Sequence, residues 1–168
     1  MPKEVARLAN QIRRACNGHM NGQPWSGPSA SDVLLGVTSE MAKAHPIPGA
    51  HSIWELVRHM TVWAEVACRR IAGEIVEPTP EEDYPPPTGD QHALDWEDDR
   101  MMFHIAHDDL ANAIEALHDD ALDTRLVSRD NYTIYITAHG VAQHVLYHTG
   151  QIALLKRAFG AQPLAPKS

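Results

Sequence analysis

Apolar side chains recur at helical spacing along four long stretches of the chain. These stretches span residues 3–17, 52–73, 95–117 and 133–159, and each predicts an α-helix with one face turned toward a core. A shorter helical piece is expected over about residues 31–43. Four long helices without a convincing set of strands predict an all-α protein folded as a four-helix bundle.

The stretch 52–73 is the most apolar of the four. Ser52, followed by Glu55 three positions later, has the S-x-x-E pattern of a capping box, which predicts where the helix begins. The apolar residues cover more than half of the helix circumference, which is typical of a helix in the middle of a bundle. They are Ile53, Leu56, Val57, Met60, Val62, Trp63, Val66, Ala67 and Ile71.

The chain around the third helix contains one segment without helical periodicity. Asp95 is the predicted N-cap of this helix. An apolar residue then follows at every seventh position: Trp96, Phe103, Leu110 and Leu117. The preceding segment 74–94 is rich in proline and cannot be helical throughout, so it forms either a crossover along the bundle or a lid over a site. The last helix opens with YTIYIT, whose β-branched residues are also compatible with a strand.

The composition is that of an acidic globular protein. The 168 residues are enough for a single domain over 1–168, and 22 Asp or Glu against 14 Lys or Arg give a formal charge of −8. Because no basic run offsets this charge, we expect no nucleic-acid partner. No segment has the apolar length of a membrane span or the pattern of a secretory signal, so no membrane partner is expected. Two cysteines are too few for a disulfide scaffold, which favours a cytoplasmic protein.

The chain contains 11 histidines, nearly as many as its lysines and arginines together. His144 and His148 are four residues apart in the last helix, so they lie about 40° apart around the axis and one turn apart along it. Both belong to the apolar stripe that should face the core. Two neutral imidazoles in neighbouring turns of such a stripe each need a partner, and a shared metal ion satisfies both.

A third ligand is predicted on the second helix. His59 is the only polar residue on its part of the apolar stripe. If the second and last helices face each other, His59, His144 and His148 close a three-histidine site. Such a site leaves a fourth coordination position for water or substrate, as in catalytic zinc sites. In the alternative interpretation, these residues are hydrogen-bonded core histidines that hold no metal.

Three further residues are candidates for the lining of a pocket: Gln151, His107 and Glu55. Gln151 follows His148 by three residues on the same face, where it either hydrogen-bonds a bound ligand or joins two helices. His107 lies near the apolar stripe of the third helix and, with His104, forms a rival pair of metal ligands. Glu55 lies one turn before the third predicted ligand, although the capping box already accounts for its presence.

Three segments carry a resemblance to a known family: Trp25–Pro28, the run PIPGAHSIWELVRH at 46–59 and the block QHVLYHTGQIALLKR at 143–157. On these residues the sequence resembles the DinB/YfiT-like superfamily of helical metalloproteins over nearly the whole chain. The resemblance implies a four-helix bundle with long crossover connections, and it favours a homodimer. It also implies a divalent ion held by one histidine of the second helix and two of the last, which correspond here to His59, His144 and His148.

The resemblance and the histidine pattern together lead us to expect a divalent-metal-dependent enzyme that acts on a small molecule, with zinc or nickel as the ion. One version is a hydrolase, in which the metal lowers the pKa of bound water toward about 7. The other is a transferase or isomerase that uses a low-molecular-weight thiol as cosubstrate, as some relatives do. A non-catalytic protein that binds a metal or a small ligand is the alternative. In every version the ligand imidazoles must be neutral, so metal affinity should fall below about pH 6.

Overall fold

The computed structural model describes residues 3–87, 93–128 and 130–160. Four long helices carry most of the fold: α1 (Glu4–Cys16), α5 (Ile53–Ile71), α7 (Ala93–Glu115) and α8 (Ile134–Ala158). Short helices join them: α2 (Gly18–Asn21), α3 (Ala30–Leu34), α4 (Ser39–Lys43), α6 (Pro80–Asp83) and the 3-10 helix η1 (Asp119–Asp123). The described residues form no β-sheet, only one isolated bridge between Arg125 and Thr133, which confirms the all-α prediction. No helix among them is both long enough and apolar enough to cross a membrane.

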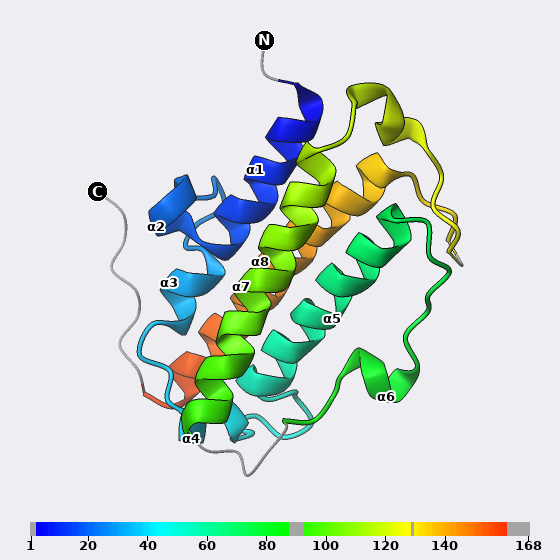
Figure 1. Cartoon of the computed structure of the whole chain (residues 1–168). Coiled ribbons are helices and arrows are strands. Elements are labelled where there is room, and N and C mark those ends of the chain that lie inside the picture. The colour runs from blue at the N-terminus through cyan, green and yellow to red at the C-terminus, as the bar shows by residue number, and fades with distance from the viewer. Residues whose placement is uncertain (1–2, 88–92, 129, 161–168) are drawn as a thin grey trace.

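The four long helices pack around one core in the cyclic order α1–α7–α5–α8. Figure 1 shows that α5 and α7 run in the same direction, opposite to α1 and α8. The end of α5 and the start of α7 therefore lie at opposite ends of the bundle, and the chain between them must travel its length. Residues 72–87, the described part of this connection, run beside α5 and contain α6 (Figure 1). The segment left open as a lid or a crossover is thus a crossover over its described length.

Side-chain hydrogen bonds determine where two of the long helices begin. Ser52 and Glu55 form the predicted capping box of α5, since each side chain accepts a hydrogen bond from the backbone N–H of the other. The Thr133 hydroxyl accepts from the backbone N–H of Ile136 and caps α8. The β-branched run YTIYIT therefore enters a helix and not a strand.

Three local details differ from the prediction. Helix α7 begins at Ala93, so Asp95 is not the N-cap residue but lies inside the first turn, where a carboxylate interacts favourably with the helix dipole. The piece expected over 31–43 is two helices, α3 and α4, because Gly36 turns the chain between them with φ of 76°. Leu117 follows the end of α7 and is only partly buried, so the seven-residue repeat loses its last member.

Large aromatic side chains fill the core where α5 and α7 meet. Trp54, Trp96 and Phe103 are fully buried, and the rings of the two tryptophans lie 5.3 Å apart. The Trp54 indole N–H donates to the Asp99 carboxylate, and the Trp96 indole N–H donates to the carbonyl of Val37. Burial of these rings therefore leaves neither indole donor unsatisfied.

Candidate metal centre

Three histidine rings meet between α5 and α8. His59 projects from the second turn of α5, and His144 and His148 project from neighbouring turns of α8. Nε2 of His144 lies 2.9 Å from Nε2 of His59 and 2.9 Å from Nε2 of His148. His59 and His148 are buried, and His144 is half-buried. In the part of the chain that the structure describes, these residues form the one group of three or more metal-ligating side chains with ligand atoms this close together.

Hydrogen bonds determine the tautomers of two of the rings. Nδ1 of His59 lies 2.7 Å from the backbone carbonyl oxygen of Asp83, and Nδ1 of His148 lies 2.7 Å from Oε1 of Gln151. Both partners are acceptors, so each Nδ1 carries the proton and donates it. Because a neutral imidazole has a single N–H, the Nε2 atoms of His59 and His148 present lone pairs.

Both lone pairs point at the same nitrogen. His144 has at most one Nε2–H, so it can donate to His59 or to His148 but leaves the other without a donor. A cation bound by all three Nε2 atoms removes this conflict. Nitrogen ligands of one zinc ion stand about 3.3 Å apart when each Zn–N bond is about 2.0 Å. The two separations of 2.9 Å are close to this value, and the three ligand atoms all lie within 4.8 Å of one another, so the group could hold a metal ion.

Burial keeps the three imidazoles neutral. Desolvation lowers the pKa of His59 and the pKa of His148. It lowers the pKa of His144 to about 3, and repulsion from the two neighbouring imidazoles adds to the effect. Near neutral pH the three rings are therefore uncharged, which is the protonation state that metal ligation requires.

Sequence reasoning missed the residues that surround His59. Oδ1 of Asp83 also lies 3.1 Å from Nδ1 of His59, and it accepts a hydrogen bond of 2.6 Å from the indole of Trp63. The ring of Tyr84 stacks on the His59 ring with centroids 3.9 Å apart. One signal for this segment was present: Thr79 precedes Pro-Glu-Glu, the start pattern of a capped helix, and α6 begins there.

The three predicted pocket residues have different surroundings. Gln151 accepts the hydrogen bond from Nδ1 of His148 and so orients one ring of the cluster. Glu55 caps α5 and accepts the backbone N–H at the start of that helix. His107 is buried in α7, where its Nδ1 donates to the carbonyl of Phe103 and its Nε2 has no partner among the described residues. Gln151 therefore hydrogen-bonds a ring of the cluster, and His107 lies close enough to His144 to help lower its pKa.

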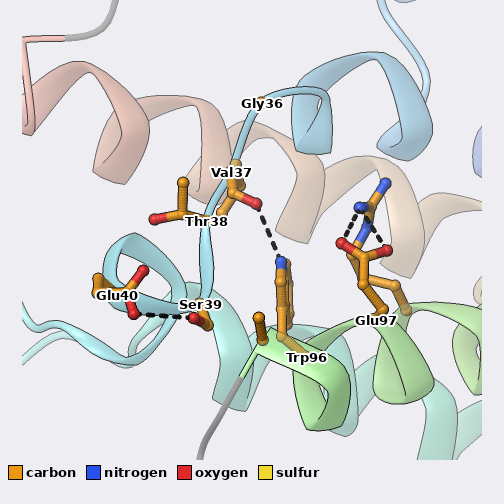
Figure 2. A pocket seen from close by; sticks show the side chains of 9 residues that line it. Gly36, Val37, Thr38, Ser39, Glu40, Trp96 and Glu97 are labelled. Carbon is orange, nitrogen blue, oxygen red and sulfur yellow. Dashed lines mark hydrogen bonds and ion pairs between the residues drawn. The ribbon is translucent and has the colours of Figure 1, made fainter.

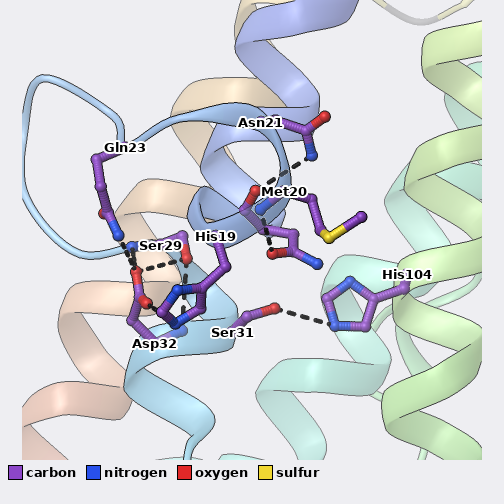
Figure 3. Close-up of polar contacts among 9 residues, drawn as sticks. His19, Met20, Asn21, Gln23, Ser29, Ser31, Asp32 and His104 are labelled. Carbon is purple, nitrogen blue, oxygen red and sulfur yellow. Dashed lines mark hydrogen bonds and ion pairs between the residues drawn. The ribbon is translucent and has the colours of Figure 1, made fainter.

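The rival pair on α7 makes other contacts. Nε2 of His104 lies 3.2 Å from the Ser31 hydroxyl, a polar contact between α3 and α7 that Figure 3 shows. His107 is bonded within its own helix, and among the described residues neither ring belongs to a group of three or more possible metal ligands. Beside them, Asp32 pairs with the exposed His19 at 2.8 Å (Figure 3). These polar contacts connect the short helices to each other and to α7.

A separate surface pocket of about 500 Å³ lies where the connection between α3 and α4 meets the start of α7. In its lining, the indole of Trp96 donates to the carbonyl of Val37 (Figure 2). Glu97, also in the lining, pairs with Arg100 at 2.9 Å. None of the three cluster histidines lines this pocket. The cavity is therefore distinct from the candidate metal centre.

Comparisons with known proteins found a family match. A model of the DinB superfamily matches residues 29–152, a range that contains all three cluster histidines. No curated protein and no solved structure matches the chain. Because the matched range covers more than half of the chain, the protein belongs to the DinB superfamily.

Proposed function

We propose that the protein is a divalent-metal-dependent enzyme that acts on a small molecule, with His59, His144 and His148 as the metal ligands. The proposal is carried by the convergence of three Nε2 atoms, two of which present lone pairs toward the third. Membership of the DinB superfamily, in which metal binding is frequent, supports the same conclusion. Three imidazoles suit zinc or nickel, because both ions accept nitrogen ligands readily.

The surrounding residues hold the three rings in a binding orientation. The Asp83 carbonyl and the Gln151 amide keep the protons of His59 and His148 at Nδ1. Neither ring can flip without losing its hydrogen bond. Three neutral ligands leave the charge of a bound ion undiminished and one coordination position open. A divalent ion held in this way supplies Lewis-acid chemistry, which lowers the pKa of a bound water or thiol.

Two reactions suit this ligand set: hydrolysis, and transfer or isomerisation with a low-molecular-weight thiol. The cysteines of the chain do not supply that thiol. Cys16 is buried in α1, and Cys68 lies nine residues beyond His59 on α5, outside the cluster. Burial raises the pKa of both thiols, so neither is a reactive thiolate near neutral pH. In the transferase version the thiol is therefore a separate small molecule.

The first test of the metal site uses protein purified without a polyhistidine tag. Elemental analysis is expected to find one divalent ion per chain in the wild type and none in His144→Ala. His139→Ala is a matched control, because His139 lies on the same helix with its ring against Tyr135. Equal metal content in the wild type and His144→Ala would refute the proposed site.

The second test separates the reactions. Metal-replete protein is assayed with a panel of esters and amides and, separately, for conjugation of thiols to electrophiles. Metal-dependent hydrolysis without conjugation identifies a hydrolase, and the reverse result identifies a thiol transferase. If the protein binds one ion but turns over no substrate in either panel, the proposal of an enzyme is contradicted. A non-catalytic protein that binds a metal or a small ligand is then favoured.

A further inference from the structure

The crossover between α5 and α7 reaches the histidine cluster at Asp83 and Tyr84. We propose that these two are positioning residues for His59, so that metal binding at the cluster and docking of the crossover stabilise each other. The inference rests on the proposed function, because His59 is the ligand through which α5 would bind the ion.

Asp83 contacts the His59 ring with two of its oxygen atoms. Its carbonyl oxygen lies 2.7 Å from Nδ1 of His59, and its carboxylate oxygen Oδ1 lies 3.1 Å from the same nitrogen. The carboxylate is held in turn by the indole N–H of Trp63, one turn further along α5, at 2.6 Å. An oxygen acceptor at Nδ1 fixes the tautomer and the ring orientation of a ligand imidazole and makes its Nε2 more basic.

Tyr84 restricts the movement of the His59 ring out of its own plane. The phenol ring lies between His59 and His51, with centroid distances of 3.9 and 3.8 Å and planes within 4° and 2° of parallel. Nδ1 of His51 lies 3.5 Å from the carboxylate of Glu55, the capping residue of α5. The stack of three rings is thus attached to α5 at both of its ends.

Tyr84 packs against the core, but the short helix before it adds no buried side chain. Helix α6 has four residues, and none of them is buried. The contacts of Asp83 and Tyr84 with His59 attach the part of the crossover beside the cluster. Further back along the crossover, Arg70 of α5 binds the carbonyl of Val76 and the carboxylate of Glu77. A bound ion would immobilise His59, so less conformational entropy would be lost when Asp83 and Tyr84 dock against it. By linkage, the contacts favour the ion by the same free energy.

The test compares Tyr84→Ala with Tyr84→Phe, which keeps the stacked ring. Zinc affinity is measured by competition with a chromophoric chelator, and hydrogen exchange of residues 74–87 is measured with and without zinc. Tyr84→Ala is expected to bind zinc roughly 10-fold more weakly and to lose the zinc-induced protection of the crossover, whereas Tyr84→Phe keeps both. Tyr132→Ala is the control, because Tyr132 is an exposed tyrosine in another loop.

A measurement on the metal-free protein reports on the position of the ring directly. NMR spectra of the wild type should show His59 protonated at Nδ1, with its ring protons shifted upfield by the stacked phenol. The upfield shift is expected to disappear in Tyr84→Ala and to remain in Tyr84→Phe. The same spectra show whether the alanine variant keeps its fold.

The outcomes distinguish this inference from the proposed function. A wild type that binds neither zinc nor nickel refutes the proposed function and the coupling together. A wild type that binds zinc no more tightly than Tyr84→Ala, or whose crossover exchanges equally fast with and without zinc, overturns the positioning role alone.

Discussion

Replacement of His107 by leucine tests how much of the acid sensitivity of the fold comes from one buried imidazole. The His107 side chain is 1% exposed, its Nδ1 donates to the Phe103 carbonyl at 2.7 Å, and its Nε2 has no partner among the described residues. Burial lowers the pKa of His107 from 6.5 to about 4. The charged form is therefore disfavoured in the folded state but not in the unfolded state.

The sign of the effect follows from proton binding. Between the two pKa values the unfolded state binds more protons than the folded state, so the free energy of unfolding falls as the pH falls. The stabilising contribution of neutral His107 is complete above about pH 6.5 and is lost progressively down to about pH 4. A difference of about 2.5 pKa units corresponds to about 3 kcal/mol. Leucine takes up no proton. Between about pH 6.5 and pH 4, the free energy of unfolding of His107→Leu should therefore fall by about 3 kcal/mol less than that of the wild type.

The assay is urea unfolding of metal-free protein, followed by circular dichroism, at steps between about pH 7.5 and pH 4. All other histidines are present in both proteins, so the difference between the two curves reports on His107 and on its interactions with His104 and His144. His118→Gln is the control, because His118 is exposed and should leave the wild-type curve unchanged. Parallel curves for the wild type and His107→Leu would refute the reasoning. In a separate measurement on the metal-loaded protein, loss of bound metal from His107→Leu would show that His107 supports the metal centre.

Three further predictions concern the metal ligands, pH and a helix cap. His144→Ala and His148→Ala should each lose the stoichiometric metal but keep the helical circular dichroism, because a core this apolar does not need the ion to fold; unfolding of either variant would make the metal structural. Burial lowers the pKa of all three candidate ligands, that of His144 to about 3. Zinc affinity measured by calorimetry should therefore change little between pH 8 and about 6.5 and weaken at lower pH. A tenfold loss of affinity by about pH 6.5 would contradict this prediction. Ser52→Ala removes the cap of α5 and should lower the free energy of unfolding in urea by about 1 kcal/mol, and an unchanged midpoint would show that the cap contributes nothing.

Patterns among neighbouring residues were sufficient to predict the helices and part of the site. Apolar residues at a period of 3.6 share a face only in a helical backbone, so the four long helices follow from spacing. The four-residue separation of His144 and His148 places both rings on one face of α8 regardless of the packing around them. The capping box of Ser52 and Glu55 likewise depends on residues within one turn.

Contacts between residues far apart in the sequence were determined only by the tertiary structure. His59 was predicted on the condition that α5 and α8 face each other, and only their packing brings its Nε2 within 2.9 Å of His144. Asp83 and Tyr84 lie in a segment without periodicity, so nothing in their spacing relates them to His59. The shared direction of α5 and α7 carries that segment past the cluster, where the Asp83 carbonyl, 24 residues along the chain, fixes the tautomer of the candidate ligand His59. Helical periodicity is a property of neighbouring residues, whereas contact between helices depends on the rotation of each helix and on the path of the connections, which no short-range pattern encodes.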